Sequence, residues 1–178
     1  MHKLKLFNFI LFSLFFVSAT HVDIELETKS LLNDRIELKI PKDFKVMSAE
    51  RIAIKYPKEN PPSLVYTDES GGTNIAMNLT SSKASQDVLP SYKDYLVKTL
   101  SKMSPSLKWK SNGVTEINGR QVCYLEFITP GIDTEIYNLM FLTDVDGKLL
   151  ICTFNCTKSD MKEWVPTAKE IMNSLKVK

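Results

Sequence analysis

Residues 114–156 decide the fold, and they read VTEINGRQVCYLEFITPGIDTEIYNLMFLTDVDGKLLICTFNC. Turn signals divide this stretch into extended segments that cover residues 114–117, 121–129, 135–143 and 148–156. Asn118-Gly119 is the strongest short hairpin signal in the chain, and the chain turns again at Pro130-Gly131 and at residues 144–147. Strands joined by short turns pair antiparallel, so this half of the chain predicts an antiparallel meander.

On either side of the meander, apolar residues recur with the 3.6-residue period of a helix. One stripe predicts a helix over residues 88–103 and consists of Leu89, Tyr92, Leu96, Leu100 and Met103. Another predicts a closing helix and consists of Met161, Trp164, Val165, Ala168, Ile171, Met172 and Leu175. Thr157 and Asp160 fit a capping box at the start of the closing helix.

Alternation of apolar and polar residues predicts further strands before the meander. They cover residues 35–40, 52–56, 64–67 and 75–79, and a short piece over residues 107–110 follows the first helix. Strands and helices in this order predict an α+β fold with a mostly antiparallel sheet and helices packed on its apolar faces.

The first 19 residues have the pattern of a signal peptide. Lys3 and Lys5 precede an almost wholly apolar stretch over residues 6–17, and small residues before Ala19 predict cleavage between Ala19 and Thr20. The apolar stretch is short against the ~20 residues that span a bilayer, and no Cys follows it for lipid attachment. We expect an exported protein, periplasmic or secreted, without a stable membrane anchor. Residues 20–30 are polar and without period and are expected to form a flexible leader, with a single domain over residues 31–178.

Charge and histidine content exclude several classes of function. Cleavage would remove two of the 23 basic residues and none of the 21 acidic ones, leaving a neutral chain that has no charge excess to attract nucleic acid. His2 would leave with the signal, and His21 would lie at the new terminus. Ser-His-Asp, Cys-His and His-zinc chemistry all need an imidazole in the domain. We therefore expect no enzyme and no cofactor.

The three cysteines are expected to be buried free thiols. If Cys123 and Cys152 lie on the first and third strands of a meander, their strands are ~9.6 Å apart, beyond the ~7 Å limit for bridged Cα atoms. Cys152 and Cys156, four residues apart on one strand, would be ~13 Å apart.

The ordered elements of the chain resemble the PsbP-like family, over nearly all of the predicted domain. The carriers of the resemblance are residues 36–44, which read IELKIPKDF, the strand around residues 74–77, the helix of residues 92–103, Asn118-Gly119 and the helix end at residues 171–175. The resemblance implies an α-β-α sandwich around a central, mostly antiparallel sheet. Members of the family serve as accessory subunits, binding proteins and secretion-associated chaperones, and they share no catalytic residues that could be carried over.

A proline-rich segment over residues 57–72 is the most unusual predicted surface. It contains Pro61, Pro62, Tyr66, Asp68 and Glu69. Proline lowers the entropy cost of holding a loop in one binding conformation, and recognition often uses loops on a rigid sheet. A partner-binding site and a purely structural connection both fit this segment.

Other candidate residues each have a structural alternative. Asp144 to Gly147 resembles the start of a calcium loop, but it lacks the further ligands and fits a turn better. Trp109 and Trp164 fit the core better than a ligand-stacking role. Glu126 stands on an apolar strand face, where an active-site acid, an edge position or a lysine partner would each explain it.

Taken together, these patterns predict an exported, non-enzymatic accessory or binding protein that acts through protein-protein contacts in the cell envelope. Its partner would be another envelope or secreted protein. The alternative is a carrier of a small apolar ligand, held in a pocket between the sheet and a helix and lined by Tyr, Phe and Met. A hydrolase fits the sequence less well than either.

Overall fold

The computed structural model describes residues 24–57 and 60–178. Its strands are β1 (Leu26–Leu31), β2 (Ile36–Pro41), β3 (Lys45–Val46), β4 (Leu64–Thr67), β5 (Asn74–Lys83), β6 (Lys108–Ile117), β7 (Arg120–Pro130), β8 (Glu135–Val145), β9 (Lys148–Thr157) and β10 (Lys176–Val177). Its α-helices are α1 (Ala49–Lys55), α2 (Leu89–Met103) and α3 (Met161–Asn173). None of the helices in this part of the chain is long and apolar enough to cross a membrane.

The antiparallel meander is confirmed and forms one side of a seven-stranded sheet with the order β3-β4-β5-β9-β8-β7-β6. Asn118 (φ 49°) and Gly119 (φ 76°) both have positive φ angles, as a two-residue hairpin turn requires. Asp146 (φ 50°) and Gly147 (φ 71°) repeat this geometry between β8 and β9. The interpretation of residues 144–147 as a turn is therefore confirmed.

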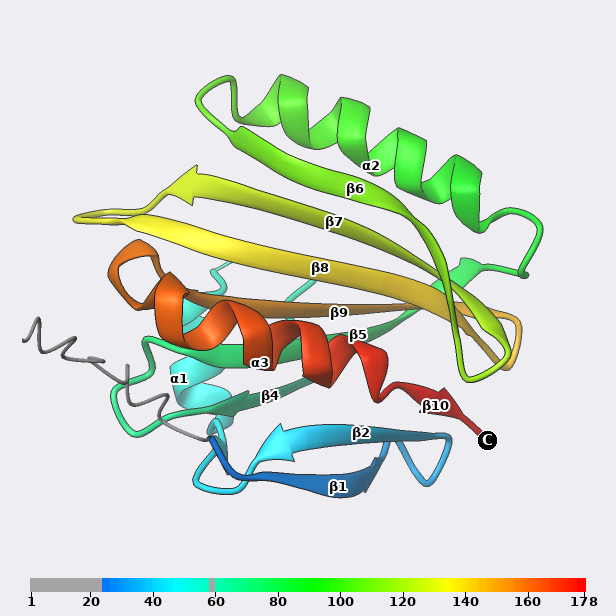
Figure 1. Ribbon diagram of the computed structural model, residues 1–178, viewed down its shortest axis with the longest axis horizontal. Coiled ribbons are helices and arrows are strands. Elements are labelled where there is room, and N and C mark those ends of the chain that lie inside the picture. The colour runs from blue at the N-terminus through cyan, green and yellow to red at the C-terminus, as the bar shows by residue number, and fades with distance from the viewer. Residues whose placement is uncertain (1–23, 58–59) are drawn as a thin grey trace, which may run out of the picture.

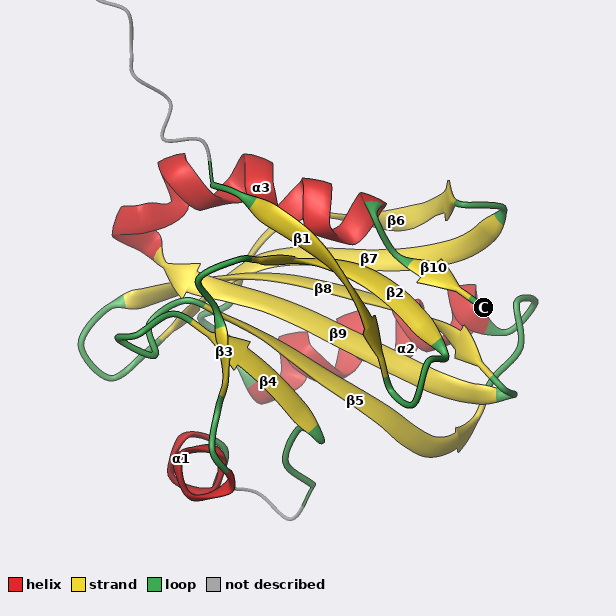
Figure 2. Ribbon diagram, turned by 90° about the horizontal axis from the view of Figure 1, so that it is seen from below, coloured by secondary structure: helices red, strands yellow, loops and turns green. Residues whose placement is uncertain are grey.

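The large sheet lies between two layers (Figures 1 and 2). Helices α1 and α2 pack on one face, where α2 covers a cluster around Leu89, Leu125 and Phe127. Helix α3 and a small sheet of order β1-β2-β10 cover the other face, over the main core. The predicted α+β fold, an α-β-α sandwich with a mostly antiparallel sheet, is confirmed.

The flexible leader predicted over residues 20–30 is wrong for its second half, because residues 26–31 form β1. This strand pairs antiparallel with β2 along its whole length, and Leu31 is only 6% exposed. Strand β1 lies at an edge and is held by backbone hydrogen bonds, so its side chains need not alternate in polarity. The predicted signal peptide and the cleavage site at Ala19 and Thr20 lie outside the described residues.

The strand predicted over residues 52–56 is also wrong, because this segment belongs to helix α1. Ser48 caps the helix by accepting a hydrogen bond from the Arg51 amide (3.3 Å). Ile52 and Tyr56 are four residues apart and both pack against the cluster beneath α1, whereas Ile54 is 74% exposed. The alternating residues Ile52, Ile54 and Tyr56 include Ile52 and Tyr56, which are also spaced as neighbours on a helix face. Packing of these two side chains against the sheet favours the helix over the strand.

The predicted capping box at the start of α3 does not form. The Thr157 hydroxyl donates to the Asp160 carboxylate (2.6 Å) instead of accepting from a backbone amide, and a 3-10 turn over Lys158–Asp160 leads into α3. The closing helix itself is confirmed, with Ala168, Ile171 and Met172 buried against the sheet.

All three cysteines are buried free thiols, as predicted. Cys123 lies on β7, and Cys152 and Cys156 lie on β9, with β8 between these two strands. Burial raises the pKa of the Cys123 thiol to about 11 and that of Cys156 to about 12, and it also raises the pKa of Cys152. The thiols therefore stay protonated and unreactive near neutral pH.

Candidate functional site

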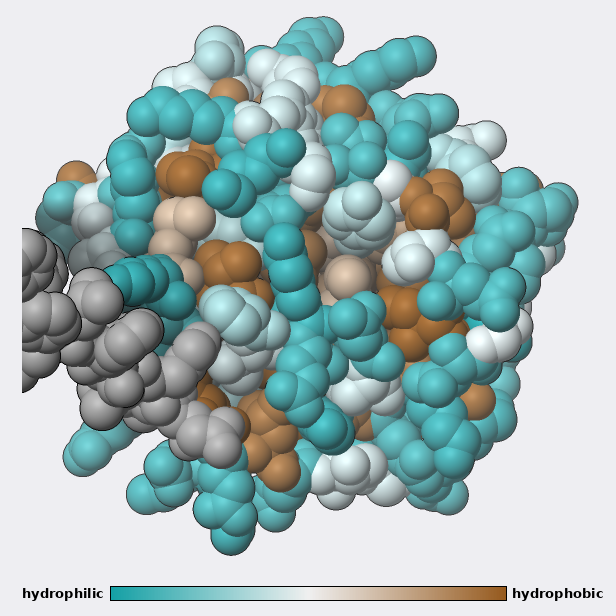
Figure 3. Space-filling model, viewed as in Figure 1, coloured by the Kyte–Doolittle hydropathy of each residue, from teal (hydrophilic) through white to brown (hydrophobic). Residues whose placement is uncertain are grey.

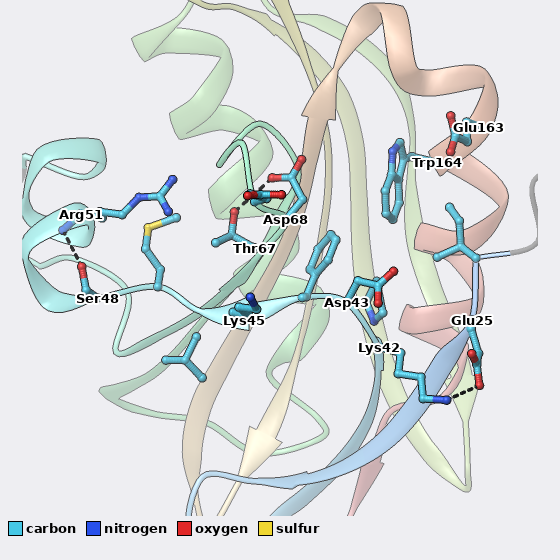
Figure 4. A pocket seen from close by; sticks show the side chains of 16 residues that line it. Glu25, Lys42, Asp43, Lys45, Ser48, Arg51, Thr67, Asp68, Glu163 and Trp164 are labelled. Atoms are coloured by element: carbon cyan, nitrogen blue, oxygen red, sulfur yellow. Dashed lines mark hydrogen bonds and ion pairs between the residues drawn. The ribbon is translucent and has the colours of Figure 1, made fainter.

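A groove of about 1090 Å³ lies at one end of the large sheet. Four segments build it: residues 24–25 just before β1, the stretch over residues 41–48 with Arg51, the β4–β5 turn, and the first turn of α3. Figure 4 shows side chains from all four segments around one open space, among them Glu25, Lys42, Arg51, Asp68, Glu163 and Trp164.

Aromatic side chains form the apolar wall of this groove. The Trp164 ring lies 5.5 Å from Phe44 and 5.8 Å from Phe154, measured between ring centroids. Phe154 is fully buried, whereas Trp164 is half-buried and lines the groove. Trp164 therefore packs against the core, as predicted, and also presents part of its ring to the groove.

Trp109, the other tryptophan predicted in the core, lies far from the groove on β6. It is half-buried, its ring packs against Phe127 at 5.3 Å, and its indole N–H donates to the Ser101 hydroxyl (3.0 Å). This side chain closes the core beneath α2.

Charged side chains surround the aromatic wall. The groove contains five acidic and three basic side chains: Glu25, Asp43, Asp68, Glu69 and Glu163, and Lys42, Lys45 and Arg51. Lys42 pairs with Glu25 at 2.6 Å. Within the described residues, the carboxylates of Asp43, Glu69 and Glu163 make no ion pair. The groove thus has an excess of negative charge, and much of it is not neutralised by neighbours.

The β4–β5 turn forms a rigid wall of the groove. The Asp68 carboxylate accepts hydrogen bonds from the Ser70 hydroxyl (2.7 Å) and the Thr73 amide (3.2 Å). Gly71 has a φ of 81°, and its carbonyl accepts a hydrogen bond from Lys55 of α1. Because Asp68 is used inside the turn, Glu69 is the carboxylate that the turn presents to solvent.

A second link holds α1 against the sheet beside the groove. The Tyr56 hydroxyl donates to the Asn74 side-chain oxygen (2.9 Å), and burial raises the pKa of Tyr56 to about 12. The tyrosine therefore remains a neutral donor at physiological pH.

The five residues predicted as a partner-binding loop do not form one surface. Asp68 and Glu69 line the groove, but Pro61 and Pro62 precede β4 and lie at its opposite end. Tyr66 lies within β4, packs against the main core and carries Lys29 over its ring at 5.7 Å. Of the five candidate residues, Asp68 and Glu69 line the groove, and Thr67 of the same segment lines it as well.

The groove also contains residues that the sequence did not single out. Phe44 was noted only as part of the family-like stretch of residues 36–44, and Lys45 and Arg51 carried no signal. They lie far along the chain from Trp164, so no local pattern joins them. Val46 is 58% exposed beside them.

A smaller hollow of about 250 Å³ lies beneath α3 and is called here the Glu126 pocket; it is lined by Ser111, Thr115, Tyr124, Glu126, Leu139, Lys169, Met172 and Asn173. The Glu126 side chain is 4% exposed and accepts hydrogen bonds from Ser111 (2.8 Å) and Tyr137 (3.1 Å). Lys169 of α3 lies 3.6 Å from the same carboxylate. The lysine partner is confirmed for Glu126, and the edge position is wrong.

In the Glu126 pocket, the buried carboxylate has its hydrogen-bond and ion-pair partners within the protein. Burial and the neighbouring Glu126 carboxylate raise the pKa of Tyr137, so the tyrosine stays a hydrogen-bond donor. Both hydroxyls around Glu126 are engaged with it. Among the residues that the structure describes, no three His, Cys, Asp or Glu side chains gather as a metal would need.

Solved structures with the same architecture come from several bacteria. Cyanobacterial PsbP (CyanoP) from Synechocystis sp. PCC 6803 superposes with a TM-score of 0.63 at 16% identity, covering 87% of this chain and 94% of that chain. LpqN, involved in cell envelope biogenesis of Mycobacterium tuberculosis, gives a TM-score of 0.52 at 14% identity, covering 86% and 90%. PA94 of Pseudomonas aeruginosa, a protein of unknown function, gives 0.51 at 15% identity, covering 86% and 97%.

No protein-family model matches the chain, and no curated protein does either. The likeness to the solved structures extends over at least 85% of the chain. It therefore includes both the order of the elements and their packing in three layers. The chain has the PsbP-like fold.

Proposed function

We propose that this protein is an exported, non-enzymatic accessory protein that binds another envelope or secreted protein through the groove. The observation that carries the proposal is the combination of a partly exposed Trp164 with carboxylates that make no ion pair within the described residues, beside the hydrogen-bonded β4–β5 turn. Aromatic residues at the centre of a contact surface, surrounded by charges, are typical of protein-protein interfaces.

Export is supported by the first 19 residues and by a protein with the same fold. The signal-peptide pattern, with its expected cleavage between Ala19 and Thr20, supports a location in the periplasm or outside the cell. LpqN, which shares the fold, is involved in cell envelope biogenesis. The non-enzymatic part of the proposal rests on the lack of histidine after residue 21 in the sequence.

The groove favours a partner segment of particular chemistry. Asp43, Glu69 and Glu163 would attract lysine or arginine, and the exposed part of Trp164 would take an apolar or cationic side chain. An extended segment with an apolar residue next to basic ones fits both features.

The alternative of a small-ligand carrier has less support. The hollow between the sheet and α3 is the Glu126 pocket, and its volume of about 250 Å³ is below the roughly 300 to 1,000 Å³ of ordinary ligand cavities. It also has a buried carboxylate where an apolar ligand would need apolar contacts.

Crosslinking in intact cells, followed by affinity capture and mass spectrometry, tests the proposal. The variant Glu69→Lys with Glu163→Lys reverses the charge of the groove at two exposed positions. The matched control, Asp87→Lys with Asp94→Lys, makes the same change in charge at exposed positions at the start of α2. We expect a specific envelope protein to be captured by the parent and the control and to be lost from the groove variant. Equal capture by all three proteins would rule out the groove as the contact surface.

A further inference from the structure

The two edges of the seven-stranded sheet differ greatly in length. One edge is β3, with two residues, and the other is β6, with ten. Helix α2 contacts β7 and β8, and Figure 1 shows β6 as the outermost strand of the sheet. A long exposed edge presents unpaired backbone N–H and C=O groups and is a template for another strand.

The first part of β6 carries features that block such pairing, and the second part does not. Lys110 is an extra residue in the ladder, because Trp109 pairs with Phe127 while Ser111 already pairs with Glu126. A bulge and lysines are the usual protection of an edge. Residues 111–117 are regular and contain neither lysine nor proline.

The hairpin fixes which backbone groups of this open part point outward. Ile117 and Arg120 flank the two-residue turn and form a hydrogen-bonded pair, so every second residue back from Ile117 is bonded to β7. The residues between them, Asn112, Val114 and Glu116, therefore direct their backbone groups away from the sheet. All three side chains are exposed, and Val114 is 43% exposed although it is apolar.

We infer that a second copy of this chain pairs antiparallel with β6 across a twofold axis at Val114. In this register Val114 lies opposite its own copy, and Asn112 lies opposite Glu116 of the second copy. All the outward backbone groups of the three residues then find partners, and the two valines cover each other. Asn112 can donate its side-chain amide to the Glu116 carboxylate of the second copy.

Charge selects the antiparallel orientation. Lys110 and Glu116 stand at opposite ends of the open part, both are exposed, and neither makes an ion pair within the described residues. Antiparallel pairing brings Lys110 diagonally beside Glu116 of the second copy, within reach of its long side chain. Parallel pairing in register would instead place Glu116 beside Glu116.

The rest of the edge leaves room for this pairing, and the pairing stops at a dimer. Gly113, between the outward residues, is covered by Tyr124, whose hydroxyl would lie 3.0 Å from a Cβ at that position. A twofold contact uses the same edge in both copies, so it closes, and the remaining edges of the two large sheets are the two-residue β3 strands. The groove lies at the β3 side of the sheet and stays open in the dimer.

Cysteine crosslinking of the mature protein tests the register. Oxidation of Val114→Cys should give a disulfide-linked dimer, because opposed hydrogen-bonded residues have Cα atoms about 5.5 Å apart. The matched control Asn112→Cys sits on the same face of the same strand, but its own copy would be about 14 Å away and should not crosslink. The native cysteines are buried and do not interfere. Equal crosslinking at both positions, or at neither, would overturn the inference.

Sedimentation equilibrium tests the dimer without crosslinks. The parent should show a concentration-dependent dimer, and Val114→Lys should be monomeric with an unchanged circular dichroism spectrum. The control Tyr95→Lys changes a residue of α2 that is 64% exposed and should still dimerise. A parent that stays monomeric throughout the accessible concentration range, or a Val114→Lys variant that still dimerises, would contradict the inference.

Discussion

The Glu126 pocket and the groove both contain carboxylates, but the two regions use them in opposite ways. In the pocket, Glu126 is almost fully buried, and Ser111, Tyr137 and Lys169 satisfy it. In the groove, Glu69 and Glu163 are exposed and make no ion pair within the described residues. A buried charge must be paired inside the protein, whereas an exposed unpaired charge is available to a partner. The pocket therefore supports the fold, whereas the groove keeps its carboxylates exposed to solvent.

The hydropathy of the surface is consistent with this division. On the face shown in Figure 3, hydrophobic residues form separate islands among hydrophilic ones. Recognition on such a surface depends on a few well-placed aromatic and charged side chains and not on a broad apolar patch.

The largest expected effect comes from removing the carboxylate of the pocket. Glu126→Ala leaves the buried Tyr137 hydroxyl without its acceptor and opens a cavity, so we expect a loss of about 2–4 kcal/mol in the free energy of unfolding. Glu69→Ala in the groove removes an exposed side chain and should change it by less than about 0.5 kcal/mol. Urea denaturation of both variants measures the difference. Similar losses of unfolding free energy for Glu126→Ala and Glu69→Ala would contradict the distinction between the pocket and the groove.

Asp68 should show an intermediate effect, since it belongs to the groove but acts within the β4–β5 turn. Asp68→Ala removes the acceptor of the Ser70 hydroxyl and the Thr73 amide, which should cost about 1 kcal/mol. Hydrogen exchange should show faster exchange at residues 69–73, with residues 137–142 of β8 unchanged. An unchanged rate at Thr73 would mean that Asp68 does not hold this wall of the groove.

The smallest effect concerns Glu135, which is partly exposed and is paired with Lys108 and Lys158. These two ammonium groups hold the pKa of the Glu135 carboxyl at about 2, below its ordinary value of 4.5. A carboxyl whose pKa is lowered by folding stabilises the protein above its unfolded pKa, and this contribution disappears as the pH falls from about 4.5 towards about 2.

Thermal unfolding across that pH range measures the contribution of Glu135. The midpoint of the parent should fall slightly more on acidification than that of Glu135→Gln, because solvent screens an exposed ion pair. If the two proteins respond identically, the lysine pairs contribute nothing, and Glu135 resembles the unpaired carboxylates of the groove.

The sequence predicted the meander and both long helices because their signals are local. Asn118-Gly119 and Asp146-Gly147 adopt the positive φ angles that hairpin turns need, and the stripe of α3 faces the sheet as its period requires. It failed at α1, where Ile52, Ile54 and Tyr56 fit two periods at once, and at β1, where an edge strand needs no alternation. Short elements at the margin of a core are decided by their neighbours and not by their own pattern.

The candidate site was predictable only in part, for a related reason. Asp68 and Glu69 stood out in a proline-rich segment, but β4 separates them from Pro61 and Pro62, which lie elsewhere. The sequence by itself determined the strands, turns and helices of the second half and the three buried thiols, because backbone conformation and burial follow from residue type and spacing over a few positions. The tertiary structure alone brought Phe44, Arg51, Asp68 and Trp164 around one groove. Their proximity depends on strand order and on where α3 crosses the sheet, and such long-range packing leaves no periodic trace in the chain.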